Sequence, residues 1–167
     1  RELVKQISDV YLSVSATTRP KSDSEVDGKD YWFVSEQEFQ ERIDNDLLLE
    51  YAKVFSHYYG TPKDKIVEAI EGGKVAILEI DVQGGKQAKA VLEDAVMIFI
   101  LPPTEKALAE RMTRRGRKGD AAEERLDGAS AEVAAAWQYY EYMVINENLQ
   151  QAVSECMQII ENARVKT

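Results

Sequence analysis

Several residue types are scarce in this chain of 167 residues, and each shortage excludes a kind of protein. The single cysteine, Cys156, cannot form a disulfide within the chain, and we expect it to be a small core residue. With only one histidine as well, the sequence excludes a Cys/His zinc cluster. No apolar run approaches the ~20 residues that span a bilayer, and no secretion signal opens the sequence. We therefore expect a cytoplasmic protein that does not bind membranes.

Positive charge is also in short supply. The 21 Lys and Arg residues face 30 Asp and Glu residues, which gives a formal net charge of -9. Nonspecific binding to nucleic acid needs a basic surface, so nucleic acid is not an expected partner. An anionic ligand would have to meet a local group of cations. The hydrophobic share of 44% and the length are those of one compact globular domain.

Two runs of strand length are almost continuously apolar, residues 75–82 and 95–101. Strands that are buried on both faces, as in a parallel sheet, have this composition. Residues 84–92 between them have the length and composition of a helix, which predicts one strand-helix-strand unit. We also expect a strand at residues 142–146 and helices at about 121–140 and 149–164. These elements predict the α/β fold class.

The segment from Ala16 to about Gly73 has a different pattern, with short strands, a charged loop and two helices. Ser35 followed by Glu38 is a capping box, which predicts a helix to about residue 46. Thr61 and the proline after it predict the start of a second helix, which ends at the paired glycines 72 and 73. The segment therefore looks like a small α+β insertion.

Two acidic residues, Glu79 and Asp81, lie at the end of the predicted strand 75–82. Their spacing of two would put both on one face of that strand. Ligands of open α/β sheets bind beyond the carboxyl ends of the strands, so a polar site is one interpretation. Acids that merely solvate the strand end are the other, and the residues alone favour neither.

Glu50 follows three leucines and precedes Tyr51 and Ala52. A carboxylate in such apolar surroundings must find hydrogen-bond donors, or its ionisation becomes costly. A guanine base offers two adjacent donors, N1–H and the exocyclic amine, whereas adenine has no such edge. On the residues alone, a salt bridge to a neighbouring Lys or Arg is the simpler interpretation.

The cations and tyrosines allow more than one interpretation. Tyr31, Tyr58 and Tyr59 are either core aromatics or phenols that share an anionic oxygen with Arg19. Five of the eight residues from 111 to 118 are cationic. These cations have three possible interpretations: a solvated surface, a nucleic-acid-binding patch or a phosphate-binding clamp. The net charge and the lack of interleaved aromatics disfavour the patch, and the glycines around them favour a lid over phosphates.

Six segments of the sequence carry a recognisable pattern, and in order they read SVSATTRP, SEVDGKDYWFVS, LLEYAKVFSHYYGTP, LEIDVQG, IFILPP and VINENL. Together they resemble guanylate kinases, and the likeness covers essentially the whole chain. It implies a P-loop nucleoside-monophosphate kinase fold, with a mostly parallel core sheet flanked by helices. The implied activity is transfer of the γ-phosphate of ATP to GMP, which gives ADP and GDP. The implied division is a core of residues 1–15, 74–109 and 126–167, a GMP-binding insertion of residues 16–73, and a lid of residues 110–125.

The resemblance also implies roles for individual residues. The residues expected around the guanine are Ser15, Glu50, Thr61, Glu79 and Asp81. The residues expected around the GMP phosphate are Arg19, Tyr31 and Tyr59, with Glu25 in the same loop. Those implied for catalysis and for ATP are Arg111, Arg115 and Arg125, with Asn146 near the adenine. Mg²⁺ is expected to arrive with ATP rather than on protein ligands. The expected substrates are ATP and GMP, with dGMP as an alternative, and the oligomeric state, monomer or homodimer, stays open.

The sequence departs from the family pattern in two places. Ser22 stands where a second phosphate-binding arginine is usual, and Lys21 would replace it only as a point charge. The phosphate-cradling motif G-x-x-x-x-G-K-[ST] does not occur in this sequence. Because Arg1 to Lys5 resemble the end of the helix that follows that motif, we expect the strand and loop to lie before Arg1.

Two other functions stay open at this stage. One is a guanylate-kinase-like module that has lost phosphate transfer and binds a partner peptide, which Ser22 and the lack of the phosphate motif favour. The other is a kinase with a different nucleotide specificity. The arginines between residues 111 and 125 favour the enzyme, because a binding module does not need cations on the ATP side.

Overall fold

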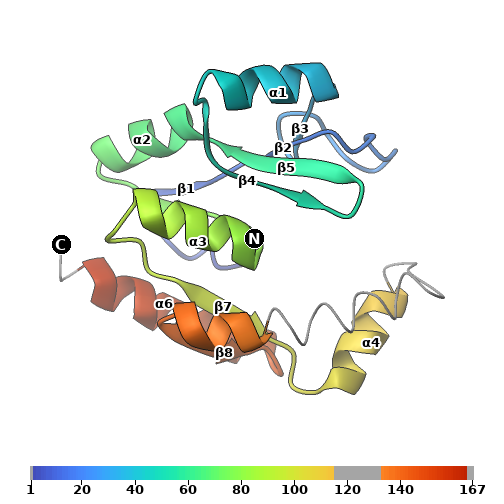
Figure 1. The fold of residues 1–167 in the computed structure, drawn as a ribbon. Coiled ribbons are helices and arrows are strands. Elements are labelled where there is room, and N and C mark those ends of the chain that lie inside the picture. Colours follow the sequence, from blue (N-terminus) through green and yellow to red (C-terminus); the bar gives the residue numbers. More distant parts are fainter. Residues whose placement is uncertain (1, 115–132, 165–167) are drawn as a thin grey trace. The chain divides into compact units, whose positions relative to one another are not determined.

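The computed structural model describes residues 2–114 and 133–164. The chain divides into two compact units (Figure 1). One unit comprises Val4–Ala95, and the other comprises Val96–Thr167 together with the first three residues. Both contain parallel strand pairs and helices, which confirms the predicted α/β class.

In the Val4–Ala95 unit, strand β1 (Val10–Leu12) pairs in parallel with β6 (Val75–Ile77). The predicted strand 75–82 is therefore real but shorter than expected. It ends with its partner, since the last pair of the ladder is Leu12 with Ile77. Asp81 instead caps the next helix, α3 (Val82–Val91), by accepting a hydrogen bond from the Gly84 N–H at 2.7 Å. The prediction that Glu79 and Asp81 share one face of a strand is wrong, since neither residue lies in a strand.

The same unit contains a four-stranded sheet in the order β3-β2-β5-β4. Its strands are β2 (Ala16–Thr17), β3 (Trp32–Phe33), β4 (Leu48–Val54) and β5 (His57–Pro62). Strands β2 and β3 are parallel, and the other two pairings are antiparallel. The chain forms a tight hairpin between β4 and β5, which leaves the other edge of β4 without a strand partner.

Strand β4 has an irregular register at Leu49. Leu48 lies opposite Pro62 and Glu50 lies opposite Thr61, so Leu49 has no partner residue on β5. An extra residue of this kind is a β-bulge, which can re-aim a side chain. Leu48 packs with Phe39 of helix α1 (Glu36–Asp44), whereas Leu49 packs with Ala88 of α3. The bulge therefore lets three successive residues of β4 be buried, Leu48, Leu49 and Glu50.

Helices α1 and α3 lie on opposite sides of the β4–β5 hairpin, as Figure 1 shows. Helix α1 (Glu36–Asp44) begins at the predicted capping box, in which Ser35 and Glu38 exchange hydrogen bonds of 2.7 and 3.1 Å. Its one buried residue, Phe39, is 1% exposed and stacks on Tyr58 with the ring centroids 5.4 Å apart.

Helix α2 (Lys63–Glu71) does not begin as predicted. Its N-cap is Pro62, which makes no side-chain capping bond. Thr61 belongs to β5, and its hydroxyl group donates a hydrogen bond to Glu50 instead. Ile66 of α2 is fully buried in a core with Leu49 and Ala88, and this core includes Tyr11 of β1 and Ala76 of β6. One apolar cluster thus joins both sheets of this unit.

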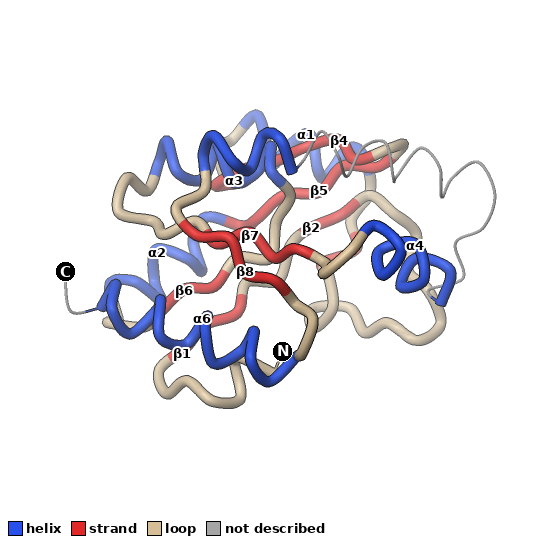
Figure 2. The backbone as a smooth tube through the Cα atoms, turned by 90° about the horizontal axis from the view of Figure 1, so that it is seen from below, coloured by secondary structure: helices blue, strands red, loops and turns tan. Residues whose placement is uncertain are grey.

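The Val96–Thr167 unit is built on a second parallel pair, β7 (Ile98–Leu101) with β8 (Tyr142–Ile145) (Figure 2). Helix α6 (Leu149–Arg164) has the predicted bounds and packs Ala152, Cys156 and Ile159 around Val144. Burial raises the pKa of the Cys156 thiol, in keeping with its predicted core role. The remaining helices are α4 (Glu105–Arg114) and residues 133–139.

Replacing Phe39 tests the packing of α1 on the sheet. We expect Phe39→Ala to lower the free energy of unfolding by about 3–5 kcal/mol, because a fully buried aromatic ring leaves a cavity. Gln40→Ala, at the adjacent exposed position, should change it by less than ~0.5 kcal/mol. Chemical denaturation of the two variants measures the difference, and equal values would show that Phe39 is not a core residue.

Candidate active site

The first part of the site is a buried carboxyl group. Glu50 is 4% exposed and accepts a hydrogen bond of 2.6 Å from the hydroxyl group of Thr61, which is fully buried. Among residues 2–114 and 133–164, no Lys or Arg forms an ion pair with Glu50. The salt bridge that the residues alone suggested is therefore wrong for the described chain.

The surroundings of Glu50 disfavour its charged form. Burial raises the pKa of its carboxyl group, hydrogen bonds from Thr61 lower it, and the negative charge of Asp81 raises it again. The net direction is upward. A carboxylate held in this way gains from any ligand that offers N–H donors to its remaining lone pairs.

Gly84 allows helix α3 to approach Glu50 closely. A Cβ atom at position 84 would lie 2.9 Å from the carboxyl carbon of Glu50 and closer still to one of its oxygens. The N–H of Gly84 also donates to Asp81, so both acids meet at the first turn of α3. Sequence reasoning missed Gly84. The available signal was a pair of glycines in the first half of a helix, where glycine is otherwise unfavourable.

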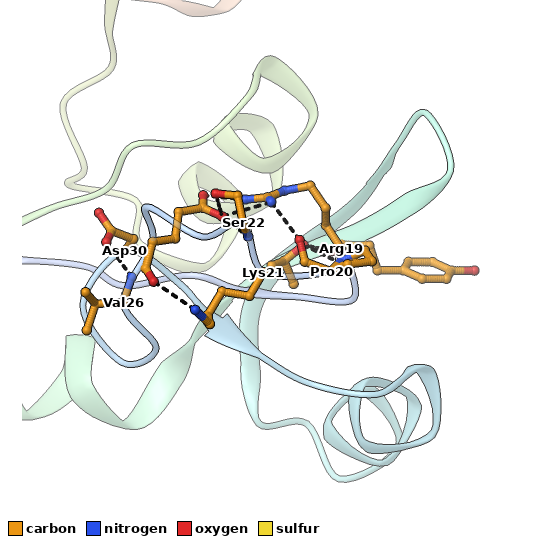
Figure 3. Close-up of polar contacts among 9 residues, drawn as sticks. Arg19, Pro20, Lys21, Ser22, Val26 and Asp30 are labelled. Carbon is orange, nitrogen blue, oxygen red and sulfur yellow. Dashed lines mark hydrogen bonds and ion pairs between the residues drawn. The ribbon is translucent and has the colours of Figure 1, made fainter.

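The second part of the site is a loop that holds Arg19 (Figure 3). The guanidinium group donates to both carboxylate oxygens of Glu25, at 2.6 and 3.0 Å. Ser22 donates to the same carboxylate through its backbone N–H at 2.9 Å and through its hydroxyl group at 2.7 Å. Lys21 donates at 3.1 Å to the backbone carbonyl of Glu25. Ser22, at the position where the resemblance led us to expect an arginine, thus fixes the acid that pairs with Arg19.

Aromatic rings surround the Arg19 guanidinium group. Its central carbon lies 5.4 Å from the ring centroid of Tyr31 and 5.6 Å from that of Phe33. Tyr31 meets Tyr59 edge-on at 5.9 Å. A hydrogen bond to Glu25, with a smaller contribution from Tyr59, raises the pKa of Arg19. The structure therefore brings Arg19, Tyr31 and Tyr59 together.

The two acids after β6 act on different parts of the site. Burial is the main cause that raises the pKa of Tyr31, and the charge of Glu79 contributes. The charge of Asp81 instead contributes at Glu50. Glu79 therefore lies toward the Arg19 loop, and Asp81 toward the buried carboxyl group.

Two serines lie between β1 and β2. Ser15 directly precedes β2, and its carbonyl group accepts a hydrogen bond of 2.9 Å from the N–H of Trp32. Ser13, which sequence reasoning did not single out, follows β1 and donates its backbone N–H to Ile77 at 2.9 Å. Its hydroxyl oxygen is buried and has no hydrogen-bond partner among the described residues.

The Val96–Thr167 unit brings two of the predicted ATP-side residues together. Arg111, on α4, donates a hydrogen bond of 2.7 Å to the backbone carbonyl of Asn146, which directly follows β8. The N–H of Asn146 in turn donates to the carbonyl of Leu101 at 2.7 Å. Arg115 and Arg125 lie outside the described residues, as does the predicted lid beyond residue 114.

The described residues contain neither a membrane-spanning helix nor a cluster of metal-ligating side chains. No helix in residues 2–114 or 133–164 is both long and apolar enough to cross a membrane. Over the same residues, His, Cys, Asp and Glu side chains do not gather in threes that could hold a metal ion.

The parallel strand pairs and their helices belong to the P-loop nucleoside-monophosphate kinase class, because the chain superposes on a solved member of that class. The family model for guanylate kinase matches residues 2–163. The chain therefore belongs to the guanylate kinase family.

Individual relatives agree with this assignment. The chain is 40% identical over 168 residues to the guanylate kinase of Maricaulis maris, an alignment that covers 99% of this chain and 77% of that protein. It is 38% identical to the guanylate kinase of Carboxydothermus hydrogenoformans, covering 99% and 81%. The crystal structure of guanylate kinase from Anaplasma phagocytophilum superposes with a TM-score of 0.86 at 30% identity, covering 99% of this chain and 80% of that one.

A double-mutant cycle tests the contact between Gly84 and Glu50. We expect Gly84→Ala to lower the free energy of unfolding by about 1–3 kcal/mol through overpacking, although alanine is the better helix former. In a Glu50→Ala background the same change should cost much less, because the clashing carboxyl group is gone. Denaturant titrations of all four proteins measure the coupling. Additive effects would show that the two residues do not meet.

The Arg19–Glu25 pair predicts a particular dependence on pH. Hydrogen bonds from Arg19 and Ser22 hold the pKa of Glu25 at about 2, below its ordinary value. A group with a lowered folded-state pKa stabilises the fold above its unfolded pKa, and that contribution fades as the pH falls toward the folded one. The stability difference between the native chain and Glu25→Gln should therefore be largest above about pH 5 and should shrink steadily toward pH 2. A difference that does not vary over this range would contradict the pairing.

Proposed function

We propose that this chain transfers the γ-phosphate of ATP to GMP and forms ADP and GDP. Membership of the guanylate kinase family over nearly the whole chain supports this activity. The structural observation that carries it is the buried Glu50 carboxyl group. This group accepts a hydrogen bond from the Thr61 hydroxyl group and forms no ion pair with a Lys or Arg among the described residues. Such a group can select a base by its N–H donors.

Selection of guanine rests on the pairing of donors and acceptors. The N1–H and exocyclic amine of guanine are adjacent donors that one carboxylate can accept together. Adenine presents an unprotonated N1 at the same edge, which would face the carboxylate with a lone pair. Asp81 and Ser15 complete the proposed base site, and Glu79 is assigned to its border with the Arg19 loop. A polar site of this kind rejects an analogue without the matching donors strongly.

The proposal places the GMP phosphate against Arg19, Tyr31 and Tyr59. A planar guanidinium group binds phosphate oxygens in the same forked geometry with which it binds a carboxylate. Glu25 occupies that fork here, so the phosphate would have to share Arg19 with Glu25 or displace it. Ser22 supplies no positive charge of its own, which leaves Lys21 as the second cation of the loop.

The transfer step does not require a general base, because a GMP phosphate oxygen is already ionised at neutral pH. That oxygen forms a bond to the γ-phosphorus as the bond from the γ-phosphorus to the bridging oxygen breaks, and ADP leaves with the electron pair. Catalysis then consists of alignment and stabilisation of charge on the moving group. We assign that stabilisation to Arg111, Arg115 and Arg125, with Asn146 on the ATP side. Mg²⁺ would supply further positive charge and would arrive bound to ATP.

One experiment tests both the activity and the choice of base. The chain is incubated with ATP, Mg²⁺ and either GMP or AMP, and the release of ADP is followed in the unsubstituted protein and in Glu50→Gln. We expect release with GMP to exceed release with AMP by a wide margin. Glu50→Gln should lower kcat/KM for GMP by about 10- to 100-fold, because a charged acceptor is lost, and should not lower the rate with AMP.

The control is Glu71→Gln, which makes the same change at an exposed position at the end of α2. It should keep the full rate with GMP. Equal losses with GMP and AMP in Glu50→Gln would contradict the role of Glu50 in base selection. GMP binding without any release of ADP would favour a module that binds the nucleotide without transferring phosphate.

A further inference from the structure

We propose that Gln87 is a positioning residue, which fixes strand β4 against helix α3 so that Glu50 and Asp81 face the same base. The inference rests on the proposed function, because it concerns how the guanine site keeps its shape. Gln87 lies on α3, one turn after Gly84, and its side chain is exposed. It belongs to none of the groups assigned above to the base, the phosphates or catalysis.

The side-chain amide of Gln87 makes two hydrogen bonds to the backbone of one residue of β4. Its Nε2 donates to the carbonyl oxygen of Tyr51 at 2.7 Å, and its Oε1 accepts from the N–H of Tyr51 at 3.2 Å. Strand β4 is the last in the order β3-β2-β5-β4, so no strand within residues 2–114 and 133–164 pairs with this edge. The amide thus satisfies a donor and an acceptor that a neighbouring strand would otherwise take.

Three residues on one face of α3 meet three successive residues of β4. Gly84, Gln87 and Ala88 are three and four positions apart, the spacing that places residues together on a helix. Ala88 packs with Leu49, Gly84 lies against Glu50, and Gln87 bonds Tyr51. The β-bulge at Leu49 and the glycine at position 84 make this close approach possible. Tyr51 directly follows Glu50 in the chain, so the amide acts one residue away from the base-selecting carboxyl group.

These contacts differ in what they can fix. Apolar packing between Leu49 and Ala88 is non-directional, so it keeps the helix on the strand but tolerates small sliding movements. Hydrogen bonds weaken steeply when their angles change, and a pair from one rigid amide to one residue fixes both distance and orientation. Glu50 and Asp81 carry like charges on opposite sides of this contact, and their repulsion favours separation. The paired hydrogen bonds of Gln87 oppose that separation.

Of the side chains of similar size, only glutamine offers both a donor for the Tyr51 carbonyl oxygen and an acceptor for the Tyr51 N–H at this distance. Asparagine is shorter by one methylene group. Glutamate keeps the acceptor for the Tyr51 N–H but places a second acceptor against the Tyr51 carbonyl oxygen. Methionine has nearly the same shape and offers neither strong group. Because position 87 is exposed, none of these changes opens a cavity in the core.

The test compares Gln87→Met and Gln87→Glu with a matched control, Gln40→Met. Gln40 is exposed on α1, and its amide donates to Asp44 at 2.8 Å, away from the site. The Kd values of GMP and AMP are measured by calorimetric titration, and hydrogen exchange of the Tyr51 amide is followed in the same proteins. We expect Gln87→Met to weaken GMP binding by about five- to tenfold, with AMP binding changed less than about twofold. Gln87→Glu should lose at least as much, and Gln40→Met should match the unsubstituted chain.

Kinetics provide a readout that general destabilisation would not give. The KM for GMP should rise with the Kd while kcat at saturating GMP changes less than about twofold. The Tyr51 amide should exchange faster in both Gln87 variants. An unchanged ratio of GMP to AMP affinity in Gln87→Met would overturn the role of Gln87 alone, whether both affinities stay the same or fall equally. No preference for GMP in the unsubstituted chain would overturn the proposed function, and this inference with it.

Discussion

A carboxyl group that is 4% exposed has to be supplied with donors, and much of the Val4–Ala95 unit is arranged around that requirement. An uncompensated buried charge is costly, and the Thr61 hydroxyl group meets only part of the need of Glu50. The bulge in β4 lets Glu50 be buried beside Leu49, the glycine at position 84 leaves room for it, and Asp81 begins the helix next to it. On the proposed function, guanine would supply the donors that Glu50 still lacks, and the burial of this carboxyl group would then favour a base with adjacent N–H groups.

In the Arg19 loop a cation, rather than an acid, is held in place by its neighbours. Glu25 neutralises Arg19 with a forked pair of hydrogen bonds, and Ser22 holds Glu25 with two more. Tyr31 and Phe33 present their rings to the guanidinium group, an arrangement that favours a cation. The loop is therefore held by its own hydrogen bonds, and on the proposed function a phosphate group would have to share Arg19 with Glu25 or replace it.

Local signals in the sequence predicted local structure well. The capping box at Ser35 and the helix at residues 149–164 were predicted correctly, because each depends on residues a few positions apart. Predictions failed where a residue was engaged by a distant partner. Thr61 was expected to cap α2, but its hydroxyl group bonds Glu50 across the hairpin. Asp81 was expected at the end of a strand, but it caps α3. In the site, no periodicity reveals that a Cβ atom at position 84 would strike Glu50, or that Gln87 bonds Tyr51. These contacts depend on the packing of a helix against a strand.

The parallel pairing of β1 with β6 has a consequence for the order of folding. Val10 lies opposite Val75, so the four-stranded sheet and both α1 and α2 are contained in the loop that this pairing closes. Closing a long loop costs chain entropy before any contact repays it, whereas the β4–β5 hairpin brings together neighbours such as Val54 and His57. We therefore expect the hairpin to form early and the β1–β6 pair late, so Asp81, which follows β6, reaches the buried carboxyl group of Glu50 only in the last stage of folding.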